Sequence, residues 1–332
     1  MWMVRAGRKG HLLDRFIDEG IATVGWKAAG KIAPGSSLDV VRDRIQQTWP
    51  AWHPQKIAMA AGQLHRFLSV IQPGDTVITF DTSQRIYKIG TATEDRRFDD
   101  ETDSDDHAHV MGVNWFGEVR RDDLQSQTRN SLGAISTLFA IRDEAEQDIM
   151  RRLRGDPPEA NRASDDFASN DDGGLSLEAI EERSAELIAD KLTQLDAYEM
   201  QELVAGVLRA MGYKTEVSPR GSDRGKDIVA SPDGFGFQDP RIVVEVKHRV
   251  GTQISAPDLR SFLGGRREGD RCLFVSTGGF SRDALYEADR AQFPVKLMTL
   301  ADLTEVILAN YDALDTPTKA LVPLTRVFWP TD

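Results

Sequence analysis

The chain has 332 residues, a formal net charge of -12 and a single cysteine, Cys272. This length exceeds one ordinary domain and indicates two, each able to bury a core of its own. One cysteine excludes an intramolecular disulfide and a cysteine-based zinc site. No apolar run reaches membrane-spanning length, and residues 1–10 carry Arg5, Arg8 and Lys9 without the apolar stretch of a signal peptide. We therefore expect a cytoplasmic protein that does not contact the membrane.

The acidic excess is concentrated in two short stretches. Residues 99–106 carry a net charge of -6 and residues 156–186 a net charge of -8, so the remainder carries about +2. Phosphate contacts supply much of the affinity of a protein for nucleic acid, and a uniformly acidic chain would argue against such a partner. Because the excess is local, DNA binding is not excluded, but we expect non-specific DNA affinity to be modest.

The N-terminal half predicts short strands that alternate with helices. Residues 121–141 indicate a short turn and then a helix or a terminal strand. Between two expected helices, TWPAWHP (48–54) brings Trp49 and Trp52 together; this loop is either a DNA-facing wedge or lid or, as we favour, a plug at a helix joint. The expected strands are 1–7, 21–26, 76–80, 85–93 and 109–119, and the expected helices are 11–20, 36–48 and 54–71.

A linker separates the two halves. Residues 154–174 are rich in Pro, Gly, Ser, Asn and Asp and hold few apolar side chains, so they cannot bury enough surface to order themselves. A helix then resumes within 175–195, with Ser176 as a plausible N-cap, and we expect it to lie outside the following core as a connector or a dimer element.

The C-terminal half predicts a layered α/β sandwich. Its last segment, 312–332, is polar and proline-bearing and is expected to be a tail. The expected helices are 199–213, one starting near Pro257, 283–293 and 301–311, and the expected strands are 225–230, 241–247, 273–277 and 295–300.

Two acids and an amine stand out within these strands. Asp227 enters one apolar run and Glu245 and Lys247 end the next. Side chains alternate faces along a strand, so Glu245 and Lys247 share one face. Carboxylate oxygens suit Mg²⁺, and a nearby ammonium can position water or stabilise charge on a phosphate. A bare match of this kind is more often a solvated strand, so its surroundings decide the interpretation.

Those surroundings resemble the Mrr-type catalytic domain of the PD-(D/E)xK nucleases over residues 195–311. The resemblance is carried by Met211-Gly212-Tyr213 after the first helix, the G-x-D that ends at Asp227, the E-x-K of 245–247, and the S-T-G-G-F turn of 276–280. It implies a Mg²⁺-dependent endodeoxyribonuclease in which Asp227 and Glu245 bind the metal and Lys247 assists the chemistry. Many relatives have a glutamate where this chain has Gln201, so Glu202, Glu199 or no first-helix acid completes the site.

Further site residues follow from this resemblance. Gln253 occupies a position where relatives often keep a polar residue near the scissile phosphate, although an ordinary loop glutamine is slightly favoured. The residues expected to contact the DNA backbone are Arg220, Arg224, Lys226, His248, Arg249, Ser276 and Thr277.

The N-terminal half is similar to the PUA, EVE and YTH group of small barrels. The matching pieces are W-x-V-R-A-G (2–7), V-G-W (24–26), P-G-D-x-V-I-T (73–79) with I-Y-K-I-G (86–90), and V-N-W (113–115). The group captures a modified or flipped base in an aromatic pocket, through stacking and hydrogen bonds. This implies a base-binding cage of Trp26, Phe80, Tyr87 and Trp115, with Trp2 less favoured, unless these side chains fill the barrel.

The resulting hypothesis is a modification-dependent (type IV) restriction endonuclease. The fold class is α/β plus α+β, with a PUA/EVE-like small β-barrel and helices in 1–150, an acidic linker and connector helix in 151–194, a restriction-endonuclease-like α/β/α sandwich in 195–311 and a tail in 312–332. The partner is modified double-stranded DNA. A homodimer or higher assembly is expected, because one active site cuts one strand. A non-catalytic nucleic-acid binder and an RNA-directed defence nuclease remain as alternatives.

Overall fold

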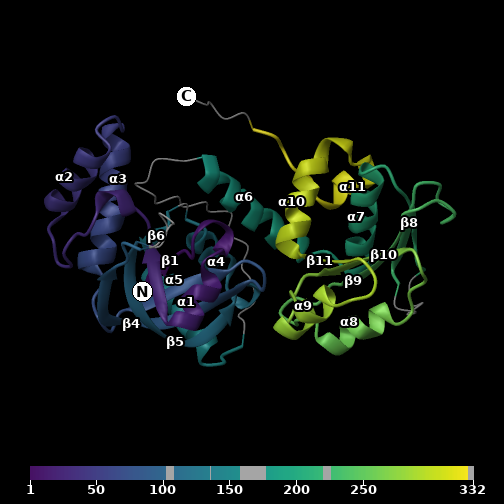
Figure 1. The fold of residues 1–332 in the computed structure, drawn as a ribbon, viewed down its shortest axis with the longest axis horizontal. Coiled ribbons are helices and arrows are strands. Elements are labelled where there is room, and N and C mark those ends of the chain that lie inside the picture. The colour runs from purple at the N-terminus through teal and green to yellow at the C-terminus, as the bar shows by residue number, and fades with distance from the viewer. Residues whose placement is uncertain (102–107, 135, 158–176, 220–225, 328–332) are drawn as a thin grey trace. The chain divides into compact units, whose positions relative to one another are not determined.

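The computed structural model describes residues 1–101, 108–134, 136–157, 177–219 and 226–327. The chain divides into two compact units, Met1–Arg183 and Ser184–Asp332 (Figure 1). In the described residues, the helices are all too short or too polar to cross a membrane.

The N-terminal unit is built on a six-stranded mixed sheet. Its strand order is β2-β5-β4-β3-β1-β6, in which β1 and β3 run parallel and the other neighbours run antiparallel. The expected strands all form, whereas the closed PUA/EVE-like barrel stays a prediction. The strands are β1 (Trp2–Val4), β2 (Ile21–Val24), β3 (Thr76–Asp81), β4 (Ile86–Phe98), β5 (His109–Arg120) and β6 (Leu138–Ala140).

Helices cover both faces of this sheet, because neighbouring strand residues point to opposite sides. Val77 joins the core beneath the first three helices, whereas Ile78 joins the core beneath the last two. The stretch 121–141 holds a helix and then the terminal strand β6. The helices are α1 (Leu13–Glu19), α2 (Leu38–Thr48), α3 (Pro54–His65, continued by a π-helical turn, Arg66–Val70), α4 (Ser126–Leu132) and α5 (Asp143–Leu153).

Trp49 and Trp52 lie in the turn between α2 and α3. Their rings stack with centroids 4.5 Å apart, the Lys56 ammonium lies 4.3 Å from the Trp52 ring centroid, and both rings pack on the core beneath α1–α3. This geometry favours the plug over the wedge or lid.

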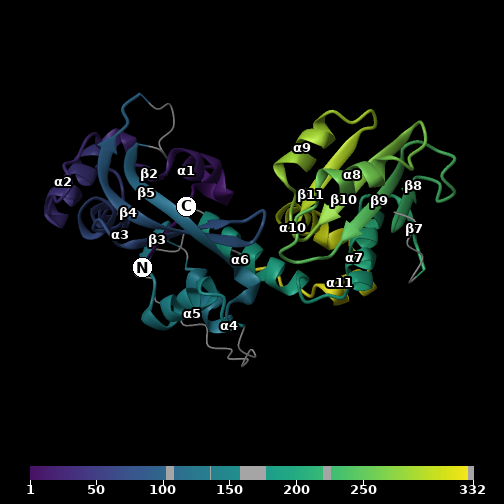
Figure 2. The same cartoon turned by 90° about the horizontal axis from the view of Figure 1, so that it is seen from below.

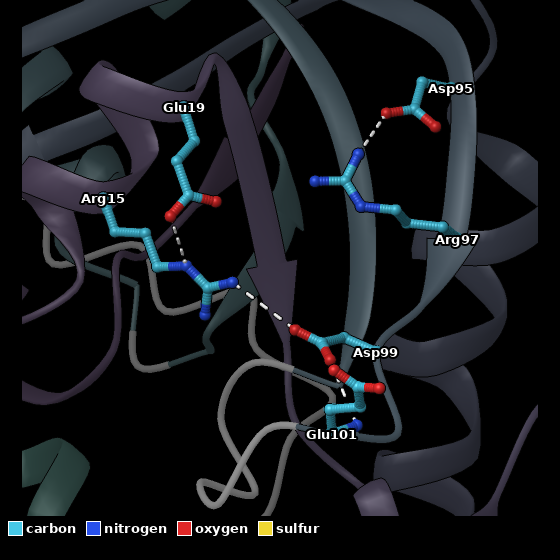
Figure 3. Close-up of polar contacts among 6 residues, drawn as sticks. All are labelled: Arg15, Glu19, Asp95, Arg97, Asp99 and Glu101. Atoms are coloured by element: carbon cyan, nitrogen blue, oxygen red, sulfur yellow. Dashed lines mark hydrogen bonds and ion pairs between the residues drawn. The ribbon is translucent and has the colours of Figure 1, made fainter.

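Part of the first acidic stretch is neutralised locally. The Arg15 guanidinium of α1 lies between two carboxylates, 3.0 Å from Glu19 Oε1 and 3.5 Å from Asp99 Oδ2 (Figure 3). Arg97 pairs with Asp95 on β4 in the same view. Such partly exposed pairs contribute little to stability, so they lower the local charge without fixing the fold.

The C-terminal unit is an α/β/α sandwich, as expected from the sequence. Its five-stranded sheet has the order β11-β10-β9-β8-β7, antiparallel from β7 to β9 and parallel from β9 to β11. The strands are β7 (Lys214–Val217), β8 (Ile228–Ser231), β9 (Arg241–Lys247), β10 (Asp270–Ser276) and β11 (Val295–Thr299).

Two separate cores fill the two faces of this sheet (Figure 2). One lies beneath α7, α10 and α11 and takes Val244 and Val246 of β9; the other lies beneath α8 and α9 and takes Val243. Capping boxes begin α7, α8 and α10. In each, the N-cap side chain accepts from the backbone N–H three residues later, and the side chain of that later residue accepts from the N-cap N–H. The helices of this unit are α7 (Ala197–Ala210), α8 (Ala256–Leu263), α9 (Arg282–Asp289), α10 (Leu300–Asn310) and α11 (Thr316–Leu321), and α6 (Leu177–Leu192) begins in the first unit and ends in this one.

Two expectations about the ends of this unit are wrong. The connector helix α6 does not lie outside the core, because Ile188 and Leu192 of its C-terminal half are buried there. The segment after residue 311 is no simple tail, because it forms α11 and buries Leu314 and Val322. A few apolar residues in each otherwise polar segment, Ile188 and Leu192 in one and Leu314 and Val322 in the other, anchor it to the core of this unit.

Candidate active site

Asp227 lies against the end of β9 that carries Glu245. The antiparallel register of β8 and β9 ends at the pair Ile228–Val244, and Asp227 precedes that pair by one residue. Asp227 N–H donates to the Val244 carbonyl at 2.9 Å, and the Val246 N–H donates to Asp227 Oδ2 at 2.7 Å. The Asp227 carboxylate therefore lies beside the backbone of Val246, the residue between Glu245 and Lys247.

Lys247 completes this cluster from the last position of β9. Its Nζ lies 2.6 Å from Glu245 Oε1; the Glu245 side chain is 8% exposed and that of Lys247 is 26% exposed. Both belong to the strand face that carries Val243, beneath α8 and α9. The structure therefore brings together the three residues on which the sequence argument depended, with the acid in the interior and the amine toward solvent.

The glycine turn after β10 supports the end of β9. Ser276 pairs with Lys247 in the parallel register, and the Thr277 N–H donates to the Lys247 carbonyl at 3.2 Å. A β-carbon on Gly278 would lie 2.2 Å from the Thr252 carbonyl oxygen and 2.5 Å from that of Arg249. Only glycine lets the turn approach the loop that follows Lys247.

Two expected DNA-backbone contacts do not fit their surroundings. The side chains of Ser276 and Thr277 are buried, and the Ser276 hydroxyl donates to the Gly279 carbonyl at 3.0 Å. The turn was expected to offer backbone N–H groups to a phosphate, but the Thr277 N–H donates to the Lys247 carbonyl and the Gly278 N–H to the Ser276 hydroxyl. We therefore correct this assignment: both residues hold the turn.

His248 also turns inward. Its Nε2 lies 2.7 Å from the Leu195 carbonyl oxygen, which ties the end of β9 to the segment before α7. The parallel register continued by one residue puts His248 beside Thr277, and within the described residues His248 Nδ1 and Thr277 Oγ1 are buried atoms without a hydrogen-bond partner. His248 therefore braces the strand in this structure and does not face outward toward a phosphate.

The other expected backbone contacts lie on accessible surface. Arg249 is exposed and Lys226 half-buried, and they flank the cluster in sequence. Arg220 and Arg224 lie outside the described residues.

The first-helix candidates come from the other side of the sheet. Gln201 and Glu202 are half-buried on α7, whose apolar residues pack on the face opposite Glu245 and Lys247. Gln253 is exposed in the loop before α8. The described contacts do not bring these three residues to the carboxylates.

Asp258 is a neighbour of the site that the sequence argument missed. Hydrogen bonds from the Ser255 hydroxyl and N–H hold the pKa of Asp258 below its usual range, and the nearby charges of Arg249 and Lys247 act in the same direction. The signal was present as Ser-x-x-Asp at 255–258, which is a capping box at the start of α8.

A family model described as restriction endonuclease, Mrr_cat, matches residues 192–307. The C-terminal unit is an Mrr-type restriction endonuclease domain. A second family model, a domain of unknown function (DUF8426), matches residues 2–142. None of the curated proteins matches the chain.

Two solved structures are similar to the whole chain at low identity. "MspJI Restriction Endonuclease in Complex with 27-mer Oligonucleotide" is 17% identical with a TM-score of 0.33, over 92% of this chain and 74% of that one. "DNA modification-dependent restriction endonuclease AspBHI" is 13% identical with a TM-score of 0.32, over 91% of this chain and 79% of that one.

The donor set of the Mrr-type domain suits a hard divalent cation. Asp227 and Glu245 supply carboxylate oxygens from neighbouring strands, and Lys247 balances one of the two charges. Groups of three or more His, Cys, Asp or Glu do not occur in the part of the chain that is described. Two carboxylates leave most of an octahedral shell to water and substrate oxygens, which is the usual manner of Mg²⁺ binding.

The predicted aromatic cage of the N-terminal unit is not assembled as a group of four. Phe80 and Tyr87 are buried in the core beneath α4 and α5, with ring centroids 4.7 Å apart and the Tyr87 hydroxyl hydrogen-bonded to Arg121. Trp26 and Trp115 pack against the core on the other face. The two pairs pack on different cores, so Phe80 and Tyr87 are core residues and we withdraw them from the cage.

Proposed function

We propose that the protein is a Mg²⁺-dependent endodeoxyribonuclease of modification-dependent (type IV) restriction. Its Mrr-type domain hydrolyses the DNA backbone, and its N-terminal unit selects a modified base. The observation that carries the proposal is that the Asp227 carboxylate accepts from the Val246 N–H at the end of β9, where Glu245 is buried and the Lys247 ammonium lies 2.6 Å from it. A solvated surface strand would not bury one of its acids.

The two acids are held before any substrate arrives. The Val246 N–H fixes Asp227 Oδ2, and the Lys247 ammonium fixes Glu245 Oε1. A fixed carboxylate needs no reorganisation when it binds a cation, and such preorganisation is a main source of catalytic stabilisation. A Mg²⁺ ion bound by these acids would lower the pKa of a bound water and neutralise phosphate charge.

Lys247 acts at the boundary between the buried acid and solvent. Its ammonium donates to Glu245, and an ammonium group has three N–H donors, which suits it to orient water or stabilise charge on the phosphate. The Thr277 N–H donates to the Lys247 carbonyl, and Gly278 packs closely on the loop that follows Lys247. These contacts fix the strand end that carries the amine. Lys226 and Arg249, with Arg220 and Arg224, are proposed to contact the DNA backbone.

Base selection is proposed for the N-terminal unit through Trp26 and Trp115. Trp26 has a positive φ of 64°, which is unfavourable for a bulky side chain and is often retained at functional positions. Trp115 is fixed by a 2.8 Å hydrogen bond from its Nε1 to the Phe16 carbonyl, and Gly90 leaves room for its ring. Two held, half-buried indoles can stack on a base.

The test is cleavage by the purified full-length protein with Mg²⁺ or with EDTA. The substrates are supercoiled plasmid DNA without modification, the same DNA with modified cytosine or adenine, phage DNA carrying other modifications, and RNA. We expect Mg²⁺-dependent cleavage of one modified DNA and little cleavage of unmodified DNA.

Three other outcomes would change the assignment. Binding of DNA without cleavage under every metal condition would indicate a non-catalytic binder. Cleavage confined to RNA would indicate an RNA-directed nuclease. Equal cleavage of modified and unmodified DNA would retain the nuclease and remove the reader.

A further inference from the structure

The loop between β8 and β9 exposes two aromatic rings. Phe235 is 79% exposed and Phe237 is 89% exposed, and their ring centroids lie 6.1 Å apart with nearly parallel planes. We call residues 231–240 the aromatic loop. Adjacent large apolar side chains at this exposure are unusual on a monomer surface and mark an interaction site.

The aromatic loop is ordered by polar contacts and not by burial of its rings. Asp233 accepts hydrogen bonds from the N–H groups of Phe235, Gly236, Phe237 and Gln238 at 3.0–3.2 Å, and from the Ser231 hydroxyl at 2.8 Å. Desolvation acts to raise the pKa of Asp233, but these hydrogen bonds outweigh it and lower the pKa to about 2. A loop ordered in advance lowers the entropy cost of binding a partner.

The position of the aromatic loop argues against the scissile DNA as its partner. Asp227 precedes the first residue of β8, and Glu245 and Lys247 end β9. The loop joins the other ends of the same two strands, at the far end of the hairpin from the active-site cluster (Figure 2). The rings therefore do not point from the strand ends that carry the acids.

Charges beside the rings are self-complementary. Lys214 is exposed on β7, and its side chain lies next to Gly234 of the loop; Asp239 is exposed at the other end of the loop. Within the described part of the chain, neither side chain forms a hydrogen bond or ion pair. In a two-fold contact each residue i meets j while j meets i, so one cation and one anion per chain can form two reciprocal pairs.

We propose that the aromatic loop is a contact between two copies of this chain, in which the Phe235–Phe237 pairs meet around a two-fold axis and Lys214 pairs with Asp239 of the other copy. The inference rests on the proposed function in one respect: cutting both strands of a duplex needs two active sites. Four rings that bury about 150–250 Å² each give less than the usual specific interface of about 1,200 Å² or more. Association is therefore concentration-dependent.

The experiment is sedimentation velocity of the full-length protein over a concentration series up to about 100 µM, where a small interface of this kind associates. We expect the wild type to move from monomer to dimer and the Phe235→Ser/Phe237→Ser variant to stay monomeric. Asp233→Ala retains both rings but removes the carboxylate whose hydrogen bonds order the aromatic loop, and we expect it to weaken association at least about tenfold. The matched control is Tyr286→Ser, another exposed aromatic in the same unit, which should associate as the wild type does.

Charge exchange tests the two-fold geometry. Lys214→Glu and Asp239→Lys each place like charges opposite one another, so each should weaken association, and the double variant should restore it. A wild type that stays monomeric throughout, unchanged association in the Phe235→Ser/Phe237→Ser variant, equal loss in Tyr286→Ser, or no restoration by charge exchange would overturn the proposal. Thermal unfolding confirms that each variant is folded.

DNA assays separate this inference from the proposed nuclease activity. If the protein cuts DNA, the Phe235→Ser/Phe237→Ser variant should nick one strand at the wild-type rate and lose double-strand cleavage. If the wild type cuts nothing, sedimentation still decides the interface. DNA binding should also be measured at a concentration at which the wild type is monomeric. If the Phe235→Ser/Phe237→Ser variant then loses DNA binding and charge exchange does not restore it, the loop contacts DNA and the proposal is overturned.

Discussion

Buried ion pairs in the two units differ in their surroundings, although the C-terminal unit also holds one enclosed pair, Arg241–Asp270. In the N-terminal unit, Arg85 pairs with Asp122 at 2.6 Å, with side chains 4% and 17% exposed, and Arg152 pairs with Asp148 at 3.2 Å, with both nearly inaccessible. In the C-terminal unit, Glu245 is equally buried, but its partner Lys247 reaches solvent and a second acid, Asp227, lies across the hairpin.

This difference separates a structural ion pair from a reactive one. A pair enclosed on both sides satisfies its own charges and has no surface to offer a substrate. An enclosed acid with an open amine and a second carboxylate has charge left for a cation and a phosphate. Substitutions should therefore change stability in the first unit and activity in the second.

Removing the open cluster should have the largest effect. We expect Lys247→Ala and Asp227→Ala each to reduce nicking of a cleavable plasmid with Mg²⁺ at least about 1000-fold, because each removes a group that acts on the metal or the phosphate. The thermal midpoint should stay within a few degrees of the wild type. Full nicking by either variant would refute the assignment, and Glu268→Ala serves as the control for an exposed charge in the same unit.

Breaking an enclosed pair should give the opposite result. Arg85→Ala leaves Asp122 without its two hydrogen bonds from the guanidinium, at 3.0 and 2.6 Å. We expect the free energy of unfolding to fall by about 3 kcal/mol, measured by urea denaturation. Cleavage of the modified DNA that the wild type cuts should be unchanged per folded molecule. A large loss of catalytic rate in the folded variant would show that the comparison is mistaken.

A substitution in the glycine turn beside Lys247 should have an intermediate effect on both the stability and the cleavage rate. Gly278→Ala forces a β-carbon against the backbone of Thr252 and Arg249, so we expect a loss of about 1–3 kcal/mol in stability and about tenfold in cleavage rate. Gly265→Ala is the matched control, because nothing lies within 4 Å of its added β-carbon. Equal behaviour of the two variants would contradict the supporting role of the turn.

A Gly→Ala substitution should lower the free energy of unfolding in one helix and raise it in another. On α7, Gly206→Ala places a β-carbon 2.1 Å from Thr318 Oγ1 of α11, and we expect a loss of about 1–3 kcal/mol. On α3, Gly62→Ala meets nothing within 4 Å, and we expect a gain of about 0.5–1 kcal/mol from helix propensity. Urea denaturation measures both, and a loss at Gly62 would contradict the open surroundings of that residue.

Much of the fold could be predicted from local sequence. Apolar periodicity, capping residues and glycine turns indicated most helices and strands, because these signals act over a few residues. The anchoring of α6 and α11 could not be predicted in this way. It depends on where Leu192 and Val322 meet a core built from distant segments.

The sequence by itself determined that Glu245 and Lys247 share one strand face, since alternation is a local property of a strand. Only the tertiary structure decided that the Asp227 carboxylate meets the end of β9 next to Glu245, that Ser276 and Thr277 are buried there, and that Phe80 and Tyr87 are on the other face from Trp26 and Trp115. Register and layer packing join residues that are far apart in the chain, and no short-range pattern encodes which faces meet.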